Sequence, residues 1–512
     1  MALVVAVAVT GVWAMRDDFG LGRNMEIMVN MMRELSTQYV DEVSADDLMQ
    51  DGAMGMVRNL DPYTEYMSDE AMSDFEFQAT GKYGGIGATI RLKRDSSGVV
   101  IAQPYKGSPS DKAGLKIGDK FVSIDGEDVT RATTEQVSSK LKGTPGTTVR
   151  LGVKRLMTGE VEELEIERAR IAISGIPYAG YVADGIGYIR HNDFSDGCYD
   201  DMRAAVERLR AEGELRGLVL DYRDNGGGSV SEAVKILSMF LPKGTEVVNM
   251  KGRTERASLT YSTESNPVLA DLPLVALING ASASASEIVA GALQDWDRAT
   301  IIGRRSFGKG LVQRQLPLGD GSAMRLTISQ YHTPTGRAIQ RPYTNGERRE
   351  YYLDNLRGYT DSITDATPHY RTLKRGRKIY GGGGVRPDVE VQADTTGYTE
   401  YYAQLMRKGV LTQTVTDWLD KERTTLLHNY PTLEQFLADY APSKGFISAL
   451  VASAEKAGIN YNAEQFERSR HWITTLVKAH LAQRLYGIEG FYRVVNPALN
   501  ESYVEALKHF EK

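Results

Sequence analysis

Apolar positions along the chain change their spacing several times, and each change predicts a different kind of element. Residues 25–35 carry apolar side chains at helical spacing. Short β-rich runs follow, such as 99–101 and 149–153, separated by Gly, Pro, Asp and Ser turns. From about 169 to 395 apolar strands alternate with helices, and beyond 396 the sequence is rich in Leu, Ala, Glu and Lys. The pattern predicts an α/β multidomain chain with a β-rich module and helical ends.

We place the boundaries of five regions at these changes of spacing. They are a truncated signal or membrane-anchor segment (1–20), an N-terminal helical region (21–80), the β-rich module (81–168), the α/β core (169–395) and a C-terminal helical region (396–512).

The first region is apolar or small over residues 2–14, apart from Thr10 and Gly11, and charge arrives at 16–18. This stretch is too short to cross a bilayer, which needs about 20 residues. Its length matches the apolar part of a signal peptide, but no basic residues precede it. A buried strand is the alternative. We expect export or membrane tethering.

Composition narrows the function classes. The chain has 512 residues, 41% of them hydrophobic and 25% charged, and a net charge of -6. A nucleic-acid binder is expected to show a basic face, which this acidic chain does not suggest. The single cysteine, Cys198, excludes an intramolecular disulfide, and with no His nearby in the sequence we expect it to pack rather than react.

The octapeptide GRRSFGKG, residues 303–310, begins like a phosphate-binding P-loop. Gly310 then occupies the place of the Ser or Thr that holds magnesium, and Pro317 limits any following helix. Nucleotide binding is therefore disfavoured, and Lys309 needs another role.

A strand, an Asn-Gly turn and a helix follow one another over residues 274–293. This order can present a serine nucleophile beside backbone N–H groups that hold an oxyanion. Ser284 and Glu287 also form a capping-box pattern, which has no catalytic meaning. The spacing alone leaves the choice open among Ser282, Ser284 and Ser286.

A serine nucleophile needs a base, and the core offers two kinds. His191, His332 and His369 lie outside any motif. Lys309 can serve if burial lowers its pKa enough for a neutral amine to form. The glycine run 226–228, which follows another strand, is a candidate anion site or a flexible loop.

Taken together, these motifs resemble the carboxyl-terminal processing peptidases, also called tail-specific proteases. The resemblance covers roughly residues 25–395 and rests on DYRDNGGG, SASASEI, SFGKGLVQ, YHTPTGRAIQ and GVRPDVEV, with LDPYT in the helical lead-in. It implies a crotonase/Clp-like protease core with an inserted PDZ domain. The implied carboxylate-binding loop of that domain is Tyr83, Gly84, Gly85, Ile86 and Gly87.

The resemblance also implies roles for single residues. Ser284 aligns with the nucleophile, Lys309 with its base and Gln313 with the glutamine that orients the lysine. Asp295 aligns with a supporting acidic position. The implied oxyanion donors are the N–H of Ala285 and one from Gly227 or Gly228.

Two positions depart from the family pattern. Gly226 replaces the usual Pro, which loosens the turn and leaves the second oxyanion donor open. His332 replaces a common Tyr, which keeps a His-assisted mechanism open.

The resemblance therefore implies a serine endopeptidase of the periplasm or cell envelope that acts on proteins with free C-termini. It needs no metal, nucleotide or other cofactor. We expect a homodimer through the helical ends and allow for an adaptor protein. The alternative is a non-catalytic PDZ scaffold with a decayed peptidase core.

Overall fold

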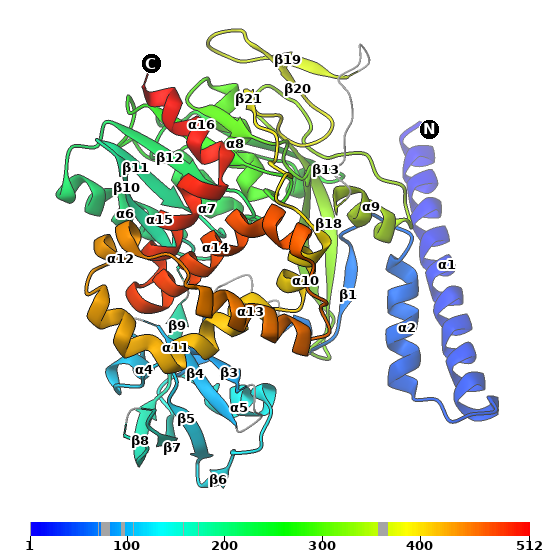
Figure 1. The fold of residues 1–512 in the computed structure, drawn as a ribbon. Coiled ribbons are helices and arrows are strands. Elements are labelled where there is room, and N and C mark those ends of the chain that lie inside the picture. The colour runs from blue at the N-terminus through cyan, green and yellow to red at the C-terminus, as the bar shows by residue number, and fades with distance from the viewer. Residues whose placement is uncertain are drawn as a thin grey trace. The chain divides into compact units, whose positions relative to one another are not determined.

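The computed structural model describes residues 2–69, 71–72, 82–93, 98–105, 107–156, 158–172, 174–356 and 367–511. The chain folds into two compact units. One comprises residues 1–73, 311–329 and 343–359, and the other comprises 74–310, 330–342 and 360–512. Figure 1 traces the order of their elements.

The smaller unit is built on two long helices and an antiparallel pairing of strands. Glu65 of β1 pairs with Arg325 of β18, and β17 pairs with β18. Among the described residues no helix is long and apolar enough to cross a membrane. The elements are α1 (Ala2–Gln38), α2 (Ala45–Val57), β1 (Glu65–Met67), β17 (Leu311–Pro317), β18 (Ala323–His332), whose end lies in the larger unit, and α9 (Arg348–Leu356).

The β-rich module of the larger unit forms a sheet in the order β3-β4-β5-β7-β8, with β6 paired to β5. Its core contains Val99, Phe121 and Leu151, all fully buried. Strand β2 pairs separately with β9. The elements are β2 (Lys82–Gly85), β3 (Ala88–Leu92), β4 (Val99–Pro104), α4 (Pro109–Lys112), β5 (Lys120–Ile124), β6 (Glu127–Asp128), α5 (Thr134–Leu141), β7 (Thr148–Lys154), β8 (Val161–Glu167) and β9 (Ala169–Ala172).

The α/β core holds a six-stranded sheet in the order β10-β11-β12-β15-β16-β21, parallel from β11 onward. Strands β11, β12 and β15 are buried at every position, as expected for parallel strands covered on both faces. The strands are β10 (Tyr178–Ala183), β11 (Ile186–Arg190), β12 (Gly217–Asp221), β15 (Leu274–Ile278), β16 (Thr300–Gly303) and β21 (Val389–Glu390).

Helices cover this sheet. Val219, Val275 and Ile302 pack from the sheet against Tyr503 and Ala506 of α16. Figure 1 shows α16, in red, against the strands of the core. The other core elements are α6 (Cys198–Glu212), α7 (Val230–Leu237), β13 (Glu246–Gly252), η1 (Glu255–Ala257), β14 (Leu259–Ser262), α8 (Ala285–Asp295), β19 (His369–Arg371) and β20 (Lys378–Tyr380).

The C-terminal region is helical, as the sequence predicts, and has a core of its own that includes Leu411, Phe436 and Ile473. Its helices are α10 (Glu400–Arg407), α11 (Val410–Asn429), α12 (Leu433–Asp439), α13 (Lys444–Lys456), α14 (Ala463–Tyr486), α15 (Ile488–Leu499) and α16 (Glu501–Phe510).

Candidate active site

Two turns that follow neighbouring parallel strands form the centre of the site. Leu218 to Asp221 of β12 pair with Leu274 to Leu277 of β15, so the C-terminal ends of both strands lie side by side. The first turn, residues 222–228, contains the glycine run, and the second, residues 279–284, contains the candidate serines. Backbone and side-chain bonds join them: the Ala283 N–H donates to the Asn225 carbonyl at 2.9 Å.

The structure distinguishes the three serines. Ser282 and Ser286 are fully buried, and their hydroxyls donate to the carbonyls of Tyr222 and Asn225 at 2.8 and 2.9 Å. Ser284 is only partly buried. Its backbone has φ 56° and ψ -116°, a conformation that costs free energy in a residue with a side chain and is typical of functional turns. Ser282 and Ser286 hold the turn, and Ser284 is the one of these three serines that is partly exposed to solvent.

The glycine turn lies directly against Ser284. A side chain at Gly227, whose φ is +98°, would come within 2.7 Å of the Ser284 Cβ and 2.8 Å of the Ala285 nitrogen. The Gly227 N–H donates to the Asn225 Oδ1 at 2.8 Å. Within the described residues the N–H groups of Ala285 and Gly228 donate no hydrogen bond. Two N–H groups, one at the start of α8 and one in the glycine turn, are therefore not used by the hydrogen bonds of the described fold.

Lys309 comes to the same place from the segment after β16. The Phe307 N–H donates to the Ser282 carbonyl at 2.9 Å, which fixes this segment to the serine turn. Residues 311–317 continue as strand β17 rather than as the helix that a P-loop requires. The fold thus supports a role for Lys309 apart from nucleotide binding.

Glu287 connects Lys309 to Ser284. Its Oε2 accepts from the backbone N–H of Ser284 at 2.9 Å and of Lys309 at 2.8 Å. Its Oε1 accepts from the Ser306 hydroxyl at 2.5 Å and the Gly308 N–H at 2.7 Å. Burial raises the pKa of Glu287 to about 7, although each of these four bonds acts to lower it. The capping pattern seen in the sequence is part of this larger network.

Tyr331 makes a second connection between the same two residues. Its hydroxyl lies 2.6 Å from the Lys309 carbonyl oxygen and 3.1 Å from the Ser284 carbonyl oxygen, and donates to both. Tyr331 is 1% exposed. Glu287 and Tyr331 therefore hold the amide and carbonyl groups, respectively, of the Ser284 and Lys309 backbones.

The chain matches known peptidases over most of its length. Residues 185–345 match peptidase family S41, residues 100–155 match the PDZ domain family, and residues 401–487 match a family of unknown function, DUF8443. A carboxy-terminal-processing protease of Bartonella bacilliformis is 35% identical over 314 residues, covering 61% of this chain and 71% of the relative. A probable CtpA-like serine protease of Staphylococcus haemolyticus is 32% identical over 358 residues, covering 68% of this chain and 70% of the relative.

The chain belongs to the carboxy-terminal-processing proteases of peptidase family S41. It is a serine protease with a PDZ domain, which confirms the family, the fold class and the enzyme class predicted from the motifs. A solved photosystem II D1 C-terminal processing protease is 25% identical, with a TM-score of 0.37, and covers 72% of this chain and 93% of its own.

Asp295 lies at the far end of α8 from Ser284 in this protease. Its Oδ1 is 2.8 Å from Nη2 of Arg337, and both side chains are fully buried. Its Oδ2 accepts from the backbone N–H and the hydroxyl of Thr335 at 2.9 and 2.8 Å. Asp295 therefore fixes the segment after β18, which begins just beyond Tyr331, to the end of the helix that Ser284 starts.

Gln313 lies on β17 in the smaller unit. Its Nε2 donates to the Thr327 hydroxyl at 3.1 Å, and that hydroxyl donates to Asp61 Oδ1 at 2.8 Å. Asp61 also accepts from the N–H and the hydroxyl of Thr64 at 3.1 and 2.5 Å. The LDPYT motif, whose role the sequence did not reveal, is thus part of the network that fixes Gln313.

The three histidines occupy different environments. His191 is fully buried beside the rings of Phe194 and Tyr222, and burial lowers its pKa to about 4. Burial and then Lys251 lower the pKa of His332. His369 is exposed on β19. A buried neutral ring at His191 packs under the glycine turn, where Asn225 Nδ2 donates to the His191 carbonyl at 2.9 Å.

The expected carboxylate-binding loop is partly a strand. Tyr83, Gly84 and Gly85 belong to β2 and pair with β9, so only Ile86 and Gly87 form the connection to β3. In the described part of the chain their two N–H groups donate no hydrogen bond. A pocket of about 160 Å³ lies beside them, between β3 and α5. It is lined by Tyr83, Ile86, Ala88, Ile90, Tyr105, Ser138, Leu141 and Lys142.

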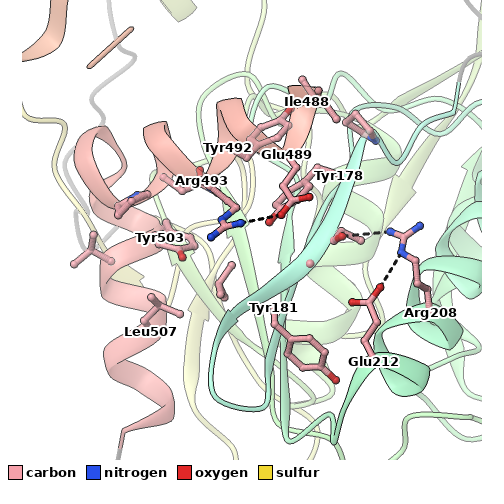
Figure 2. A pocket seen from close by; sticks show the side chains of 18 of the residues that line it. Tyr178, Tyr181, Arg208, Glu212, Ile488, Glu489, Tyr492, Arg493, Tyr503 and Leu507 are labelled. Atoms are coloured by element: carbon pink, nitrogen blue, oxygen red, sulfur yellow. Dashed lines mark hydrogen bonds and ion pairs between the residues drawn. The ribbon is translucent and has the colours of Figure 1, made fainter. Parts of the chain in front are cut away.

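A separate cleft of about 1260 Å³ lies between β10 and helices α15 and α16 (Figure 2). Arg208 is paired there with Glu212 at 3.9 Å, and Arg493 with Glu489 at 3.2 Å. None of the candidate site residues lines this cleft.

Proposed function

We propose that this protease is an endopeptidase of the cell envelope that reads substrate C-termini with its PDZ domain and cleaves with a Ser284–Lys309 dyad. One observation supports the dyad above others. Glu287 and Tyr331 each bond to the backbone of both Ser284 and Lys309. Such a doubly fixed geometry is what nucleophilic catalysis with a general base requires.

In the proposed reaction the neutral Lys309 amine accepts the proton of the Ser284 hydroxyl, and Oγ attacks the scissile carbonyl carbon. The resulting lysine ammonium then donates a proton to the departing amine, which leaves an acyl-enzyme for water to hydrolyse. The resemblance to the family assigns to Gln313 the role of orienting the lysine. The N–H groups of Ala285 and Gly228 hold the oxyanion of the tetrahedral intermediate. We choose Gly228 over Gly227 because the Gly227 N–H already donates to Asn225.

The dyad is tested by substitution. Ser284→Ala and Lys309→Ala are expected to lower kcat by about 10⁴-fold or more. Lys309→Arg is expected to be as inactive, because a guanidinium stays protonated and is no base. Ser282→Ala and Ser286→Ala serve as controls that each remove a buried hydrogen bond to a carbonyl and lower stability by about 1 to 3 kcal/mol. Ser282→Ala also removes the bond that this hydroxyl accepts from the Asn279 N–H at 2.9 Å. Near-normal cleavage by Ser284→Ala would contradict the proposed dyad.

Tail reading rests on the pocket between β3 and α5. The N–H groups of Ile86 and Gly87 are available beside it, as a C-terminal carboxylate requires. A peptide with a free apolar C-terminus is expected to bind at least about tenfold better than its C-terminal amide. Equal affinity for the two peptides would show that the PDZ domain does not read tails.

We also propose a homodimer through the helical ends. Apolar side chains on α1 and α2 are exposed, which a soluble surface rarely shows in such number. They include Leu21, Met25, Val29, Met31, Met54 and Met56. Sedimentation velocity of the parent chain and of Met25→Lys with Met31→Lys tests this, with a monomer expected for the double variant.

The proposed location in the cell envelope rests on the apolar segment 2–14. An adaptor protein remains an expectation.

A non-catalytic scaffold is the alternative function. The intact network around Ser284 argues against a decayed site, because an unused site has no need of a strained serine tied to a lysine. Labelling by a serine-reactive fluorophosphonate, present in the parent and absent in Ser284→Ala, separates the two functions.

A further inference from the structure

The C-terminal helical region touches the PDZ domain at the strand that a bound tail would extend. Strand β3 ends the sheet of the PDZ domain in the described part of the chain. Arg91 lies on β3, and its Nη2 is 3.9 Å from Oδ2 of Asp420 on α11. The two side chains are 22% and 37% exposed, so a carboxylate from solvent can reach the pair.

Three arginines lie close to Asp420 among the residues that the structure describes at this contact. Arg423 follows Asp420 by one turn of α11, and its Nη1 donates to the Arg484 carbonyl on α14 at 3.2 Å. Arg484 lies close enough to Arg91 and Arg423 that, after burial, these two cations lower its pKa. The carboxylate of Asp420 therefore interacts with three guanidinium groups. A cluster of this kind attracts a second anionic group.

The register of an added strand determines which tail residue meets Arg91. Ile86, Ala88 and Ile90 line the pocket, so Thr89 and Arg91 face the other side of the strand. A tail that runs antiparallel to β3, with its carboxylate on the amides of Ile86 and Gly87, places its last residue opposite Ala88. The fourth residue from the C-terminus then lies opposite Arg91, and cross-strand neighbours share a face.

We infer that the C-terminal helical region completes the tail-binding groove, and that Arg91, with Arg423 and Arg484 behind it, selects tails carrying Asp or Glu at the fourth position from the C-terminus. The inference rests on the proposed tail reading by the PDZ domain. It gives a role in substrate selection to part of residues 401–487, which match a family of unknown function. An acidic tail residue competes with Asp420 for Arg91, so binding also weakens the contact between the two regions.

The test measures peptide binding to the full-length Ser284→Ala chain, which holds tails without cutting them. Fluorescein-labelled octapeptides with the same apolar C-terminus carry Glu, Gln or Lys at the fourth position from the end. Fluorescence anisotropy is expected to give affinities in the order Glu, Gln, Lys, with about threefold to fivefold between Glu and Gln. The difference should shrink between 50 and 500 mM NaCl, because salt screens a partly exposed pair.

Variants assign the preference to Arg91. Arg91→Gln should remove the difference between the Glu and Gln peptides, and Asp420→Asn should enlarge it by removing the competing carboxylate. Arg150→Gln is the matched control, because Arg150 lies on β7 of the same domain and pairs with the exposed Glu165. It should keep the parental preference.

Three results overturn the inference: equal binding of the Glu and Gln peptides, a preference that survives Arg91→Gln, or one that Arg150→Gln also removes. Failure of the proposed tail reading looks different, since C-terminal amides would then bind as well as free acids. Cleavage by Ser284→Ala, checked by mass spectrometry of the peptides, would signal failure of the dyad instead.

Discussion

Asp221 and Glu287 are two fully buried carboxyl groups that hold the two turns of the site by opposite means. Asp221 ends β12 and anchors the glycine turn. It accepts from Arg223 Nε at 2.9 Å and Nη2 at 2.6 Å and lies 3.1 Å from Arg190 Nη1. Glu287 anchors the serine turn and the lysine segment through four neutral donors.

The difference decides how each group ionises. Burial acts to raise the pKa of Asp221, but Arg223 and Arg190 outweigh burial and hold it below its ordinary value. Burial prevails at Glu287 and raises its pKa to about 7, because its donors carry no charge. The glycine turn is therefore fixed by a permanent anion, and the serine turn by a group that titrates near neutral pH.

The largest expected effect is on stability, from Asp221→Asn. The change leaves Arg190 and Arg223 without their shared counter-charge in a buried site, which costs about 3 to 5 kcal/mol of the free energy of unfolding. Urea denaturation measures the loss. Asp184→Asn is the control, because that carboxylate is 95% exposed beside Arg216 and should change stability by less than about 0.5 kcal/mol. Equal losses in both variants would contradict the role given to Asp221.

Glu287→Gln comes next, with a loss of about 1 to 3 kcal/mol at pH 5 and about 100-fold in kcat. Each carboxyl oxygen of Glu287 accepts two bonds, and the NH₂ group of a glutamine accepts none, so two donors lose their acceptor whichever way the amide turns. Glu232→Gln on α7 is the control. That carboxylate is bonded to Lys235 at 2.7 Å and to the Tyr199 N–H at 2.9 Å. Neither bond involves the serine turn, so its loss should leave kcat unchanged.

The pH dependence separates the two carboxyl groups. Between the ordinary pKa of 4.5 and about 7, folded Glu287 keeps a proton that the unfolded chain has released. The free energy of unfolding therefore falls as pH rises through this window and levels off above it. Glu287→Gln lacks this slope, so its stability gap to the parent should narrow from pH 5 to pH 8. Asp221 acts in the opposite direction, and its contribution is lost as pH falls below about 3.8. If the difference in free energy of unfolding between the parent and Glu287→Gln stays constant across this range, Glu287 is ionised in the folded protein at every pH tested.

The sequence revealed the elements better than the bonds between them. The alternation of apolar strands and helices predicted β12, β15, β16 and α8, because burial on both faces leaves a clear pattern. The spacing left Ser282, Ser284 and Ser286 open, since only tertiary contacts bury two of them. Those contacts join residues far apart in the chain.

Glu287 and Tyr331 show the same limit. Glu287 looked like a helix cap, and its bonds to Ser306, Gly308 and Lys309 cross 19 to 22 residues. Tyr331 reaches Ser284 across 47 residues. In the sequence, Glu287 is visible only as part of a capping pattern and Tyr331 only as the residue before His332. Neither feature indicates which residues the side chain contacts.

Tyr331→Phe is expected to have a smaller effect, which is limited to the serine turn and the lysine segment. It removes the hydroxyl from the Lys309 and Ser284 carbonyls and leaves Glu287 in place. We expect kcat to fall about tenfold with KM nearly unchanged, because one of two ties remains. His332→Phe, one residue later, is the control and should keep the shape of the parental pH–rate profile. A shifted limb in that profile would give the base role to His332.

The smallest effect is expected on the glycine side, from Gly226→Ala. Gly226 lies outside the positive-φ region, and an added Cβ meets no atom within 4 Å. Alanine there restricts the unfolded chain without straining the folded one, which should raise the free energy of unfolding by about 0.4 to 1 kcal/mol. Gly227→Ala should act in the opposite direction, because its Cβ would come within 2.7 Å of the Ala283 oxygen at a φ of +98°. Thermal melts of the two variants, with kcat measured beside them, compare adjacent glycines in one turn. Stabilisation by both substitutions would mean that the backbone at Gly227 moves to accept a side chain. Asp221 would then not hold this part of the glycine turn rigid.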